Sequence, residues 1–252
     1  MRRLRGCWRL ARMVLHALHG LALVLLRFPS LDAGARQARI RGWSARMIRL
    51  LDIELRVQGD FHAGAKLVVV NHVSWLDIMA VHAVCPQARF VSKAEVRHWP
   101  LLGRLVDAGG TLYIERERRR DALRVVHQIA EALQSGDTVA VFPEGTTGDG
   151  HELLPFHANL LQAAIATELP VQPVALRFAD RRSPVSESAA YVGDTTLAQS
   201  MWRLACGEGI VVTLSVLSAR GTAHADRRRL AQTLRDDIAE ALQDIDRPHG
   251  AR

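Results

Sequence analysis

The chain has 252 residues, of which 48% are hydrophobic, and its formal net charge is +7. This length and composition suffice for one large α/β domain with a sizeable core, and they argue against a mainly disordered chain. Residues 1–60 carry twelve arginines, no lysine and four acidic residues, so this segment holds the whole positive surplus. The distribution favours an anionic membrane as partner of the N-terminal segment, and it argues against a nucleic-acid-binding domain in the rest.

The N-terminal segment predicts two helices at a membrane surface. Residues 13–26 form a stretch of fourteen residues without a formal charge, fewer than the about 20 that a membrane-spanning helix needs. A second helix is expected from about residue 35 to residue 51, where apolar residues recur at helical spacing among arginines. We predict that residues 1–55 form a two-helix hairpin lying in one membrane leaflet. The alternatives are a first helix packed on the soluble domain and a cleavable signal peptide.

From residue 66 onward, strand-like runs alternate with helical runs. Strands are expected at 67–71, 88–92, 111–114, 137–142, 171–178 and 209–218, and helices at about 75–84, 121–134, 157–168 and 224–245. The alternation predicts an α/β fold for residues 56–252, with a mixed, largely parallel central sheet flanked by helices. Residues 180–200 carry weak signals, and we expect a loop or short edge strands there. The three cysteines are widely spaced, which indicates a reducing compartment, and no metal site is predicted.

His72 and Asp77 are the first candidates for catalysis. His72 directly follows a buried strand-like run, and Asp77 falls in the first turn of the next expected helix. A histidine oriented by an aspartate is a general base near neutral pH. Two plainer interpretations compete with this one: a packed histidine at a strand end, and a capping box in which Ser74 caps the helix and Asp77 reaches back to its amide.

Three further polar groups follow other strand-like runs. The loop 142–147 contains Glu144 and Gly145, and its glycines permit a close backbone approach to a phosphate or a developing oxyanion. Arg116 is the second residue after the expected strand 111–114 and is a candidate for binding a phosphate. Lys93 follows the strand at 88–92 and is a candidate second cation, although a solvated lysine is equally compatible. Because ligands of open α/β sheets bind outside the carboxyl ends of the strands, we expect these groups to face one crevice.

Four blocks of residues now show the order and spacing of a known family. They are Asn71-His72-x-Ser74-Trp75-x-Asp77, Tyr113-Ile114-Glu115-Arg116, Phe142-Pro143-Glu144-Gly145-Thr146 and Val171-Gln172-Pro173-Val174. The pattern resembles the signature of the 1-acyl-glycerol-3-phosphate acyltransferase family over roughly residues 60–180. The N-terminal hairpin resembles the membrane anchor of bacterial members, which implies a monotopic protein on the cytosolic face of the inner membrane.

The resemblance implies transfer of a fatty acyl group from acyl-carrier protein or acyl-coenzyme A to a lysolipid hydroxyl, with no other cofactor. His72 would take the hydroxyl proton while Asp77 holds the imidazole, and the alkoxide would attack the thioester without a covalent acyl-enzyme. Binding roles are implied for Glu144, Gly145 and Thr146 toward the acceptor, for Lys93 and Arg116 toward its phosphate, and for Pro173 at the end of the acyl pocket.

One position departs from the family pattern. Many members have an arginine after Phe-Pro-Glu-Gly-Thr that is linked to phosphate binding, whereas this chain has Thr147. The variant also resembles acyltransferases that act on lyso-ornithine lipid. We expect lysophosphatidate slightly ahead of lyso-ornithine lipid as acceptor, because Lys93 and Arg116 still offer cations. A thioesterase on the same scaffold and a non-catalytic lipid-binding protein are the hypotheses from other classes.

Overall fold

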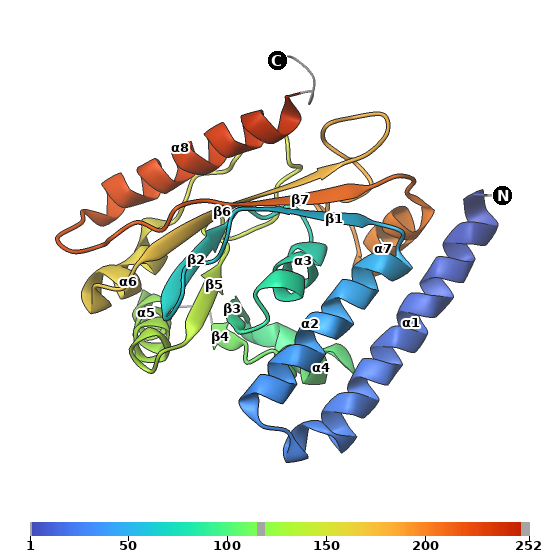
Figure 1. The fold of residues 1–252 in the computed structure, drawn as a ribbon, viewed down its shortest axis with the longest axis horizontal. Helices are drawn as coiled ribbons and strands as arrows, with labels where there is room; N and C mark the ends of the chain where they lie inside the picture. The colour runs from blue at the N-terminus through green and yellow to red at the C-terminus, as the bar shows by residue number, and fades with distance from the viewer. Residues whose placement is uncertain (1, 115–118, 248–252) are drawn as a thin grey trace.

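The computed structural model describes residues 2–114 and 119–247, and in it a central sheet is covered by helices on both faces (Figure 1). The strands are β1 (Glu54–Gln58), β2 (Lys66–Val70), β3 (Ala88–Lys93), β4 (Leu112–Ile114), β5 (Thr138–Val141), β6 (Val171–Ala179) and β7 (Val211–Val216). The α-helices are α1 (Arg2–Leu26), α2 (Ala33–Leu50), α3 (Leu76–Val84), α4 (Leu102–Ala108), α5 (Arg119–Gln134), α6 (Gln162–Thr167), α7 (Leu197–Cys206) and α8 (Arg227–Asp246). Short 3₁₀ turns are η1 (Phe28–Ser30), η2 (Ala94–His98) and η3 (Ala158–Leu161).

The sheet has the order β1-β7-β6-β2-β5-β3-β4. Neighbouring strands run parallel except β6 and β7, which are antiparallel. The predicted α/β fold with a mixed, largely parallel sheet is therefore confirmed. The carboxyl ends of β6, β2, β5, β3 and β4 lie along one edge of the sheet, which is where the polar loops of the sequence begin.

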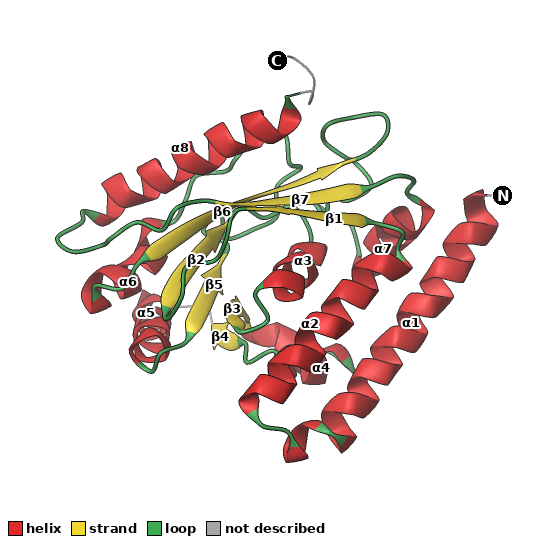
Figure 2. Ribbon diagram, in the orientation of Figure 1, coloured by secondary structure: helices red, strands yellow, loops and turns green. Residues whose placement is uncertain are grey.

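Helices lie on both sides of the sheet (Figure 2), and two clusters of buried hydrophobic residues lie between the sheet and these helices. Residues 67–70 of β2 are all fully buried because both faces of this central strand are covered, as is usual for parallel strands. Val68 and Val70 pack toward α2 and α3, whereas Leu67 and Val69 pack toward α5, α6 and α8. The strand that leads to His72 is thus buried on both of its faces.

The N-terminal hairpin packs closely on itself. His16 and Trp43 bind reciprocally: the Trp43 indole N–H donates to the His16 carbonyl oxygen at 3.1 Å, and His16 Nε2 lies 2.9 Å from the Trp43 carbonyl oxygen. Gly20 allows this approach, because a Cβ there would fall 2.4 Å from Trp43 Nε1. Arg9 is buried and binds Asp52 at 2.6 Å, so this arginine holds the fold together and contributes nothing to a membrane surface.

The structure also contains elements that the sequence did not predict. The edge strand β1 and the helices α4 and α7 are absent from the predicted element list. Residues 180–200 were expected to be a loop or edge strands, and this is wrong at the end of the range, because α7 begins at Leu197. Its start carries a capping box between Thr196 and Gln199, a Thr-x-x-Gln signal that was present in the sequence. The first helix also begins much earlier than residue 13, at Arg2.

Candidate active site

His72 and Asp77 form a hydrogen-bonded pair at the carboxyl end of β2. Nδ1 of His72 lies 2.8 Å from Oδ2 of Asp77, whose side chain is fully buried, while the His72 side chain keeps 18% of its surface exposed. The carboxylate oxygen only accepts, so Nδ1 is the protonated nitrogen of the neutral ring. Nε2 therefore carries a lone pair, which is the state that a general base requires.

The backbone around Asp77 explains how a spacing of five residues brings the two side chains together. Oδ2 of Asp77 also accepts from the amides of Val73 at 2.7 Å and Ser74 at 2.9 Å. Helix α3 begins only at Leu76, so His72 lies outside it, as predicted. Half of the predicted capping box is present, since the Asp77 carboxylate accepts from the Ser74 amide. The other half is missing, because the Ser74 hydroxyl accepts from the Leu76 amide at 3.3 Å and not from the amide of Asp77. Orienting the histidine and closing the turn are thus done by the same oxygen.

The imidazole ring is also fixed by an aromatic neighbour. His72 stacks on Phe142 with ring centroids 3.8 Å apart and an interplanar angle of 10°, and Phe142 in turn stacks on Phe90 of β3. The stacking joins the ends of β2 and β5 to the middle of β3. Phe142 was singled out in the sequence only as part of its block, and its contact with His72 follows from the sheet order.

Glu144 connects the end of β2 to the loop that follows β5. Its two carboxylate oxygens accept from the backbone amides of His72 at 2.7 Å and Leu154 at 2.9 Å, and the residue is buried. Burial raises the pKa of Glu144 above its ordinary value, while the two backbone hydrogen bonds oppose this rise. Both oxygens thus face the protein backbone, and the acceptor-binding role of this residue stays a prediction.

The loop after β5 is folded against His72. Gly145 has a positive φ of 72°, and the Gly148 amide donates to the His72 carbonyl oxygen at 2.8 Å. Thr146 is exposed at the surface of this loop. The Thr147 hydroxyl donates to the carbonyl oxygen of Tyr191, and the Tyr191 amide donates to the Val73 carbonyl oxygen at 3.0 Å. The backbone of Tyr191 therefore joins the two site loops, and nothing in the local sequence of either loop predicts this contact.

Lys93 and Pro173, two further predicted site residues that the structure describes, make no hydrogen bond or ring contact with this pair. Lys93 is exposed at the carboxyl end of β3, and no contact joins it to His72 among the described residues. Pro173 is buried in β6, where it pairs with Val69 of β2. Arg116 lies outside the described residues. Convergence is thus shown for the loops that follow β2 and β5, and it stays a prediction for the cations.

Asn71 belongs to the first sequence block, which gave it no role, and the structure shows that its side chain binds the backbone of β6. Its side-chain amide donates to the Leu176 carbonyl oxygen at 2.9 Å, and its carbonyl oxygen accepts from the Leu176 amide at 2.7 Å. The side chain thus continues the β2–β6 ladder for one more step, immediately before His72. This buried pair fixes the direction in which the chain leaves the sheet.

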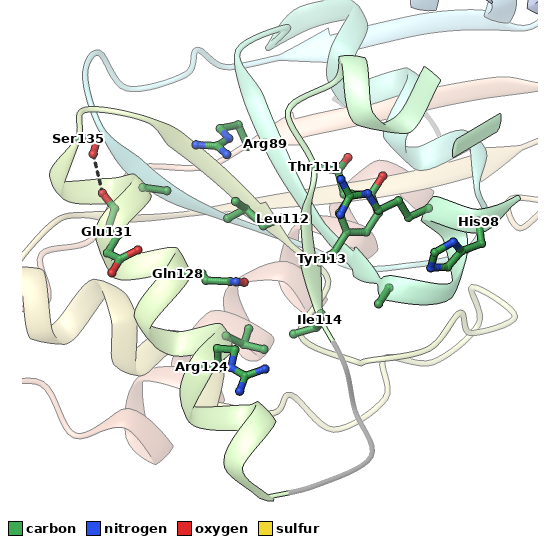
Figure 3. Close-up of a pocket in the computed structure, with 14 residues that line it drawn as sticks. Arg89, His98, Thr111, Leu112, Tyr113, Ile114, Arg124, Gln128, Glu131 and Ser135 are labelled. Atoms are coloured by element: carbon green, nitrogen blue, oxygen red, sulfur yellow. Dashed lines mark hydrogen bonds between the residues drawn. The ribbon is translucent and has the colours of Figure 1, made fainter. Parts of the chain in front are cut away.

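A separate groove of about 590 Å³ runs along the outer edge of β4 (Figure 3). It is lined by Tyr113 and Ile114 of β4, by Arg124 and Gln128 of α5, and by His98 at the end of η2. Neither His72 nor Asp77 lines it. The groove is therefore distinct from the histidine–aspartate pair.

Comparison with known proteins places this geometry in a family. The acyltransferase profile matches residues 53–177, the segment that holds both site loops. The chain is 37% identical to the lyso-ornithine lipid O-acyltransferase of Pseudomonas aeruginosa, over 96% of this chain and 95% of that protein. The chain belongs to the acyltransferase family. The resemblance drawn from the four sequence blocks is thereby confirmed.

Other relatives are named for a different acceptor. The chain is 34% identical to the 1-acyl-sn-glycerol-3-phosphate acyltransferase of Neisseria meningitidis, over 85% of this chain and 84% of that protein. The crystal structure of a 1-acyl-sn-glycerophosphate acyltransferase from Thermotoga maritima aligns over the whole of both chains with a TM-score of 0.75 and 18% identity. That similarity supports the fold alone.

Proposed function

We propose that this acyltransferase transfers an acyl group from an acyl thioester, carried by acyl-carrier protein or coenzyme A, to the free hydroxyl of a lysolipid. The observation that carries the proposal is the His72–Asp77 pair, in which Nδ1 is held by a buried carboxylate and Nε2 is left to accept a proton. No serine or cysteine nucleophile is needed, because the acceptor supplies the attacking oxygen.

In the proposed reaction, Nε2 of His72 takes the proton of the lysolipid hydroxyl as its oxygen attacks the thioester carbonyl carbon. A carbon–oxygen bond forms, the carbon–sulfur bond breaks, and the departing thiolate receives the proton from the imidazolium, which regenerates neutral His72. Asp77 stabilises the imidazolium between these steps, in the manner of a triad aspartate. Glu144 and Asn71 keep the histidine backbone in place, which counts because small displacements of a general base are costly.

The acceptor that the chain favours is lyso-ornithine lipid, with lysophosphatidate as the second candidate. The relative that aligns over 96% of the chain is a lyso-ornithine lipid O-acyltransferase. Thr147 stands where many family members have a phosphate-linked arginine, and its hydroxyl is engaged by the Tyr191 carbonyl. Two observations support lysophosphatidate. The Neisseria relatives are 1-acyl-sn-glycerol-3-phosphate acyltransferases, and Lys93 is an exposed cation at the carboxyl end of β3.

The proposal includes a membrane location, because the outer face of α1 is apolar. Among the described residues, α1 is the helix that is long and apolar enough to cross a membrane. Its opposite face is buried against α7, α2 and α4, so a bilayer-spanning position would carry packed polar elements into the lipid. The large apolar side chains exposed on α1 are Leu4, Trp8, Val14, Leu15, Leu18, Leu25 and Leu26.

The neighbouring helix α2 carries positive charge, which suits an anionic membrane surface. Five arginines of α2 are exposed, namely Arg36, Arg39, Arg41, Arg46 and Arg49. An apolar face flanked by arginines is typical of helices that lie in the interface of an anionic membrane. We therefore place α1 parallel to the membrane surface, and the cytosolic face of the bacterial inner membrane remains the proposed location.

The experiment that tests the function is a choice of acceptor. Purified protein receives labelled acyl-carrier protein or coenzyme A thioester together with equal amounts of lyso-ornithine lipid and lysophosphatidate. The proposal predicts labelled diacylated lipid, with lyso-ornithine lipid as the preferred acceptor. Release of free fatty acid at the same rate without either lipid would instead identify a thioesterase.

A further inference from the structure

Helix α8 covers the face of the sheet that lies opposite the N-terminal hairpin (Figure 1). Strand β6 is buried along nearly its whole length, and one of its buried side chains is charged. This side chain belongs to Arg177, which is only 6% exposed. A buried guanidinium is costly unless its N–H groups find acceptors, so its partners show what the arginine holds in place.

Arg177 joins the end of α8 to the loop between β5 and η3, residues 142–157. Its Nη2 donates to Oδ2 of Asp246 at 2.8 Å, and its Nη1 donates to the carbonyl oxygen of Gly150. Gly150 has a positive φ of 88°, and a Cβ there would meet the side chain of Val73 at 3.6 Å. Arg177 therefore anchors the loop where it packs against the residue that follows the site histidine.

A second arginine, Arg235 of α8, holds the same loop a few residues later. Its Nη2 donates to the Leu153 carbonyl oxygen at 2.6 Å, and its Nε donates to the Leu154 carbonyl oxygen at 3.3 Å. The Leu154 amide donates in turn to one carboxylate oxygen of Glu144, whose other oxygen binds the His72 amide. Arg235 thus fixes the residue that holds Glu144.

The anchored loop binds both backbone polar groups of His72. Glu144 accepts from the His72 amide at 2.7 Å, and the Gly148 amide donates to the His72 carbonyl oxygen at 2.8 Å. Hydrogen bonds in which one partner is charged are stronger than neutral ones. The two guanidinium groups therefore connect α8, through the loop, to the backbone that carries the imidazole.

We propose that Arg177 and Arg235 are positioning residues for the acyl transfer, which anchor the loop so that it fixes the backbone of His72. The inference rests on the proposed function, in which a small displacement of the base is costly. Among the hydrogen bonds of the described residues, neither arginine binds His72 or Asp77. Both arginines thus act through the loop and not on the imidazole.

The test measures amide hydrogen exchange by NMR in full-length protein with nitrogen-labelled glycine, leucine and valine, without donor or acceptor. Arg177→Met and Arg235→Met remove the donors and keep an unbranched side chain. In Arg177→Met we expect the Gly148 amide to exchange about ten- to a hundredfold faster, because a hydrogen bond from a charged donor is lost. The Leu154 amide should change by the same factor in Arg235→Met. The amides of Val139 and Val141 in β5 should keep their wild-type rates, and unchanged exchange at both loop amides would overturn the proposal.

Two further variants make the test specific. Arg220→Met is the matched control, because Arg220 binds Asp237 of α8 at 2.5 and 2.7 Å, and none of its hydrogen bonds within the described residues reaches the loop. It should leave exchange at Gly148 and Leu154 unchanged, and an equal rise there would overturn the specific role of the two arginines. Arg235→Lys keeps a charged donor, so its exchange should lie between those of wild type and Arg235→Met. A rate equal to that of Arg235→Met would overturn the hydrogen-bonding role.

Acyl transfer supplies the second readout. Arg177→Met and Arg235→Met should each lower kcat by at least about tenfold and keep the wild-type KM for the acyl thioester, because the base is displaced and the donor site is not. Faster exchange with a wild-type kcat would overturn the positioning role. Arg235 is only partly buried, so Arg235→Met answers the question even if Arg177→Met does not fold. Because exchange is measured without substrates, a wild-type protein without acyl transfer would refute the proposed function and leave the anchoring measurable.

Discussion

The carboxylate of Asp77 serves three donors with one buried oxygen, so two substitutions at this position separate its roles. Oδ2 accepts from His72 Nδ1 and from the amides of Val73 and Ser74 at 2.7 to 2.9 Å. Asp77→Asn keeps the size of the side chain and one acceptor oxygen but removes the charge. Asp77→Ala removes the acceptor itself.

The expected magnitudes follow from these contacts. In Asp77→Ala the two backbone amides become buried donors without a partner, each costing about 1–3 kcal/mol, or about 2–6 kcal/mol together. That is a large share of a total stability of about 5–15 kcal/mol. Asp77→Asn is expected to lose less than about 3 kcal/mol. Its acyl transfer should nevertheless fall by on the order of 10²–10⁴-fold, because a neutral amide neither selects the tautomer nor stabilises the imidazolium.

The assay pairs urea unfolding with the initial rate of acyl transfer for each variant. His72→Ala is the control that should lose activity but keep stability. It removes the imidazole from a partly exposed position and leaves the amides of Val73 and Ser74 bound to Asp77. Its rate should be as low as that of Asp77→Asn, while its stability should exceed that of Asp77→Ala. A wild-type rate in Asp77→Asn, or an unchanged unfolding free energy in Asp77→Ala, would refute the reasoning.

Three further predictions concern pH, specificity and packing. Burial raises the pKa of Glu144, so the folded state holds that proton more tightly than the unfolded state. The unfolding free energy should decrease as pH rises from the ordinary value of 4.5 through the raised pKa, and urea titrations should show no such decrease in Glu144→Gln. Thr147→Arg should raise kcat/KM for lysophosphatidate about tenfold relative to lyso-ornithine lipid, through charge-assisted hydrogen bonds to the phosphate; an unchanged ratio would remove Thr147 as a specificity position. Gly20→Val should lower stability by about 1–3 kcal/mol in thermal unfolding, because its side chain would enter the space of the Trp43 ring. Gly42→Val on α2, where a Cβ meets nothing within 4 Å, is the matched control, and equal losses in both variants would contradict the packing argument.

The contact between His72 and Asp77 was predictable because its geometry is local. His72 and Asp77 are five residues apart, and a strand end followed by a helix start leaves few ways to arrange them. The same holds for the central strands, whose continuous apolar runs predict burial on both faces. Residues 67–70 and 138–141 were placed correctly for this reason.

Other parts of the site depend on contacts between distant segments. Glu144 binds the amide of Leu154, and Thr147 binds the carbonyl of Tyr191, but nothing in the local pattern of either loop indicates its partner. The edge strand β1 escaped prediction because most of its residues are exposed, which weakens the alternation of apolar and polar residues. The division of the chain at residue 55 stays a prediction, and Met47 and Ile48 of α2 lie in the core of the following domain.

The central claim is that His72 acts as the base in acyl transfer to a lysolipid hydroxyl, and one measurement tests it most directly. Wild-type protein and His72→Ala are given the same labelled acyl thioester with and without lyso-ornithine lipid, and the labelled diacylated product is followed over time. The account predicts product only with wild-type protein and acceptor together, and a loss of at least about 10²-fold in His72→Ala. Product formation by folded His72→Ala at the wild-type rate would contradict it.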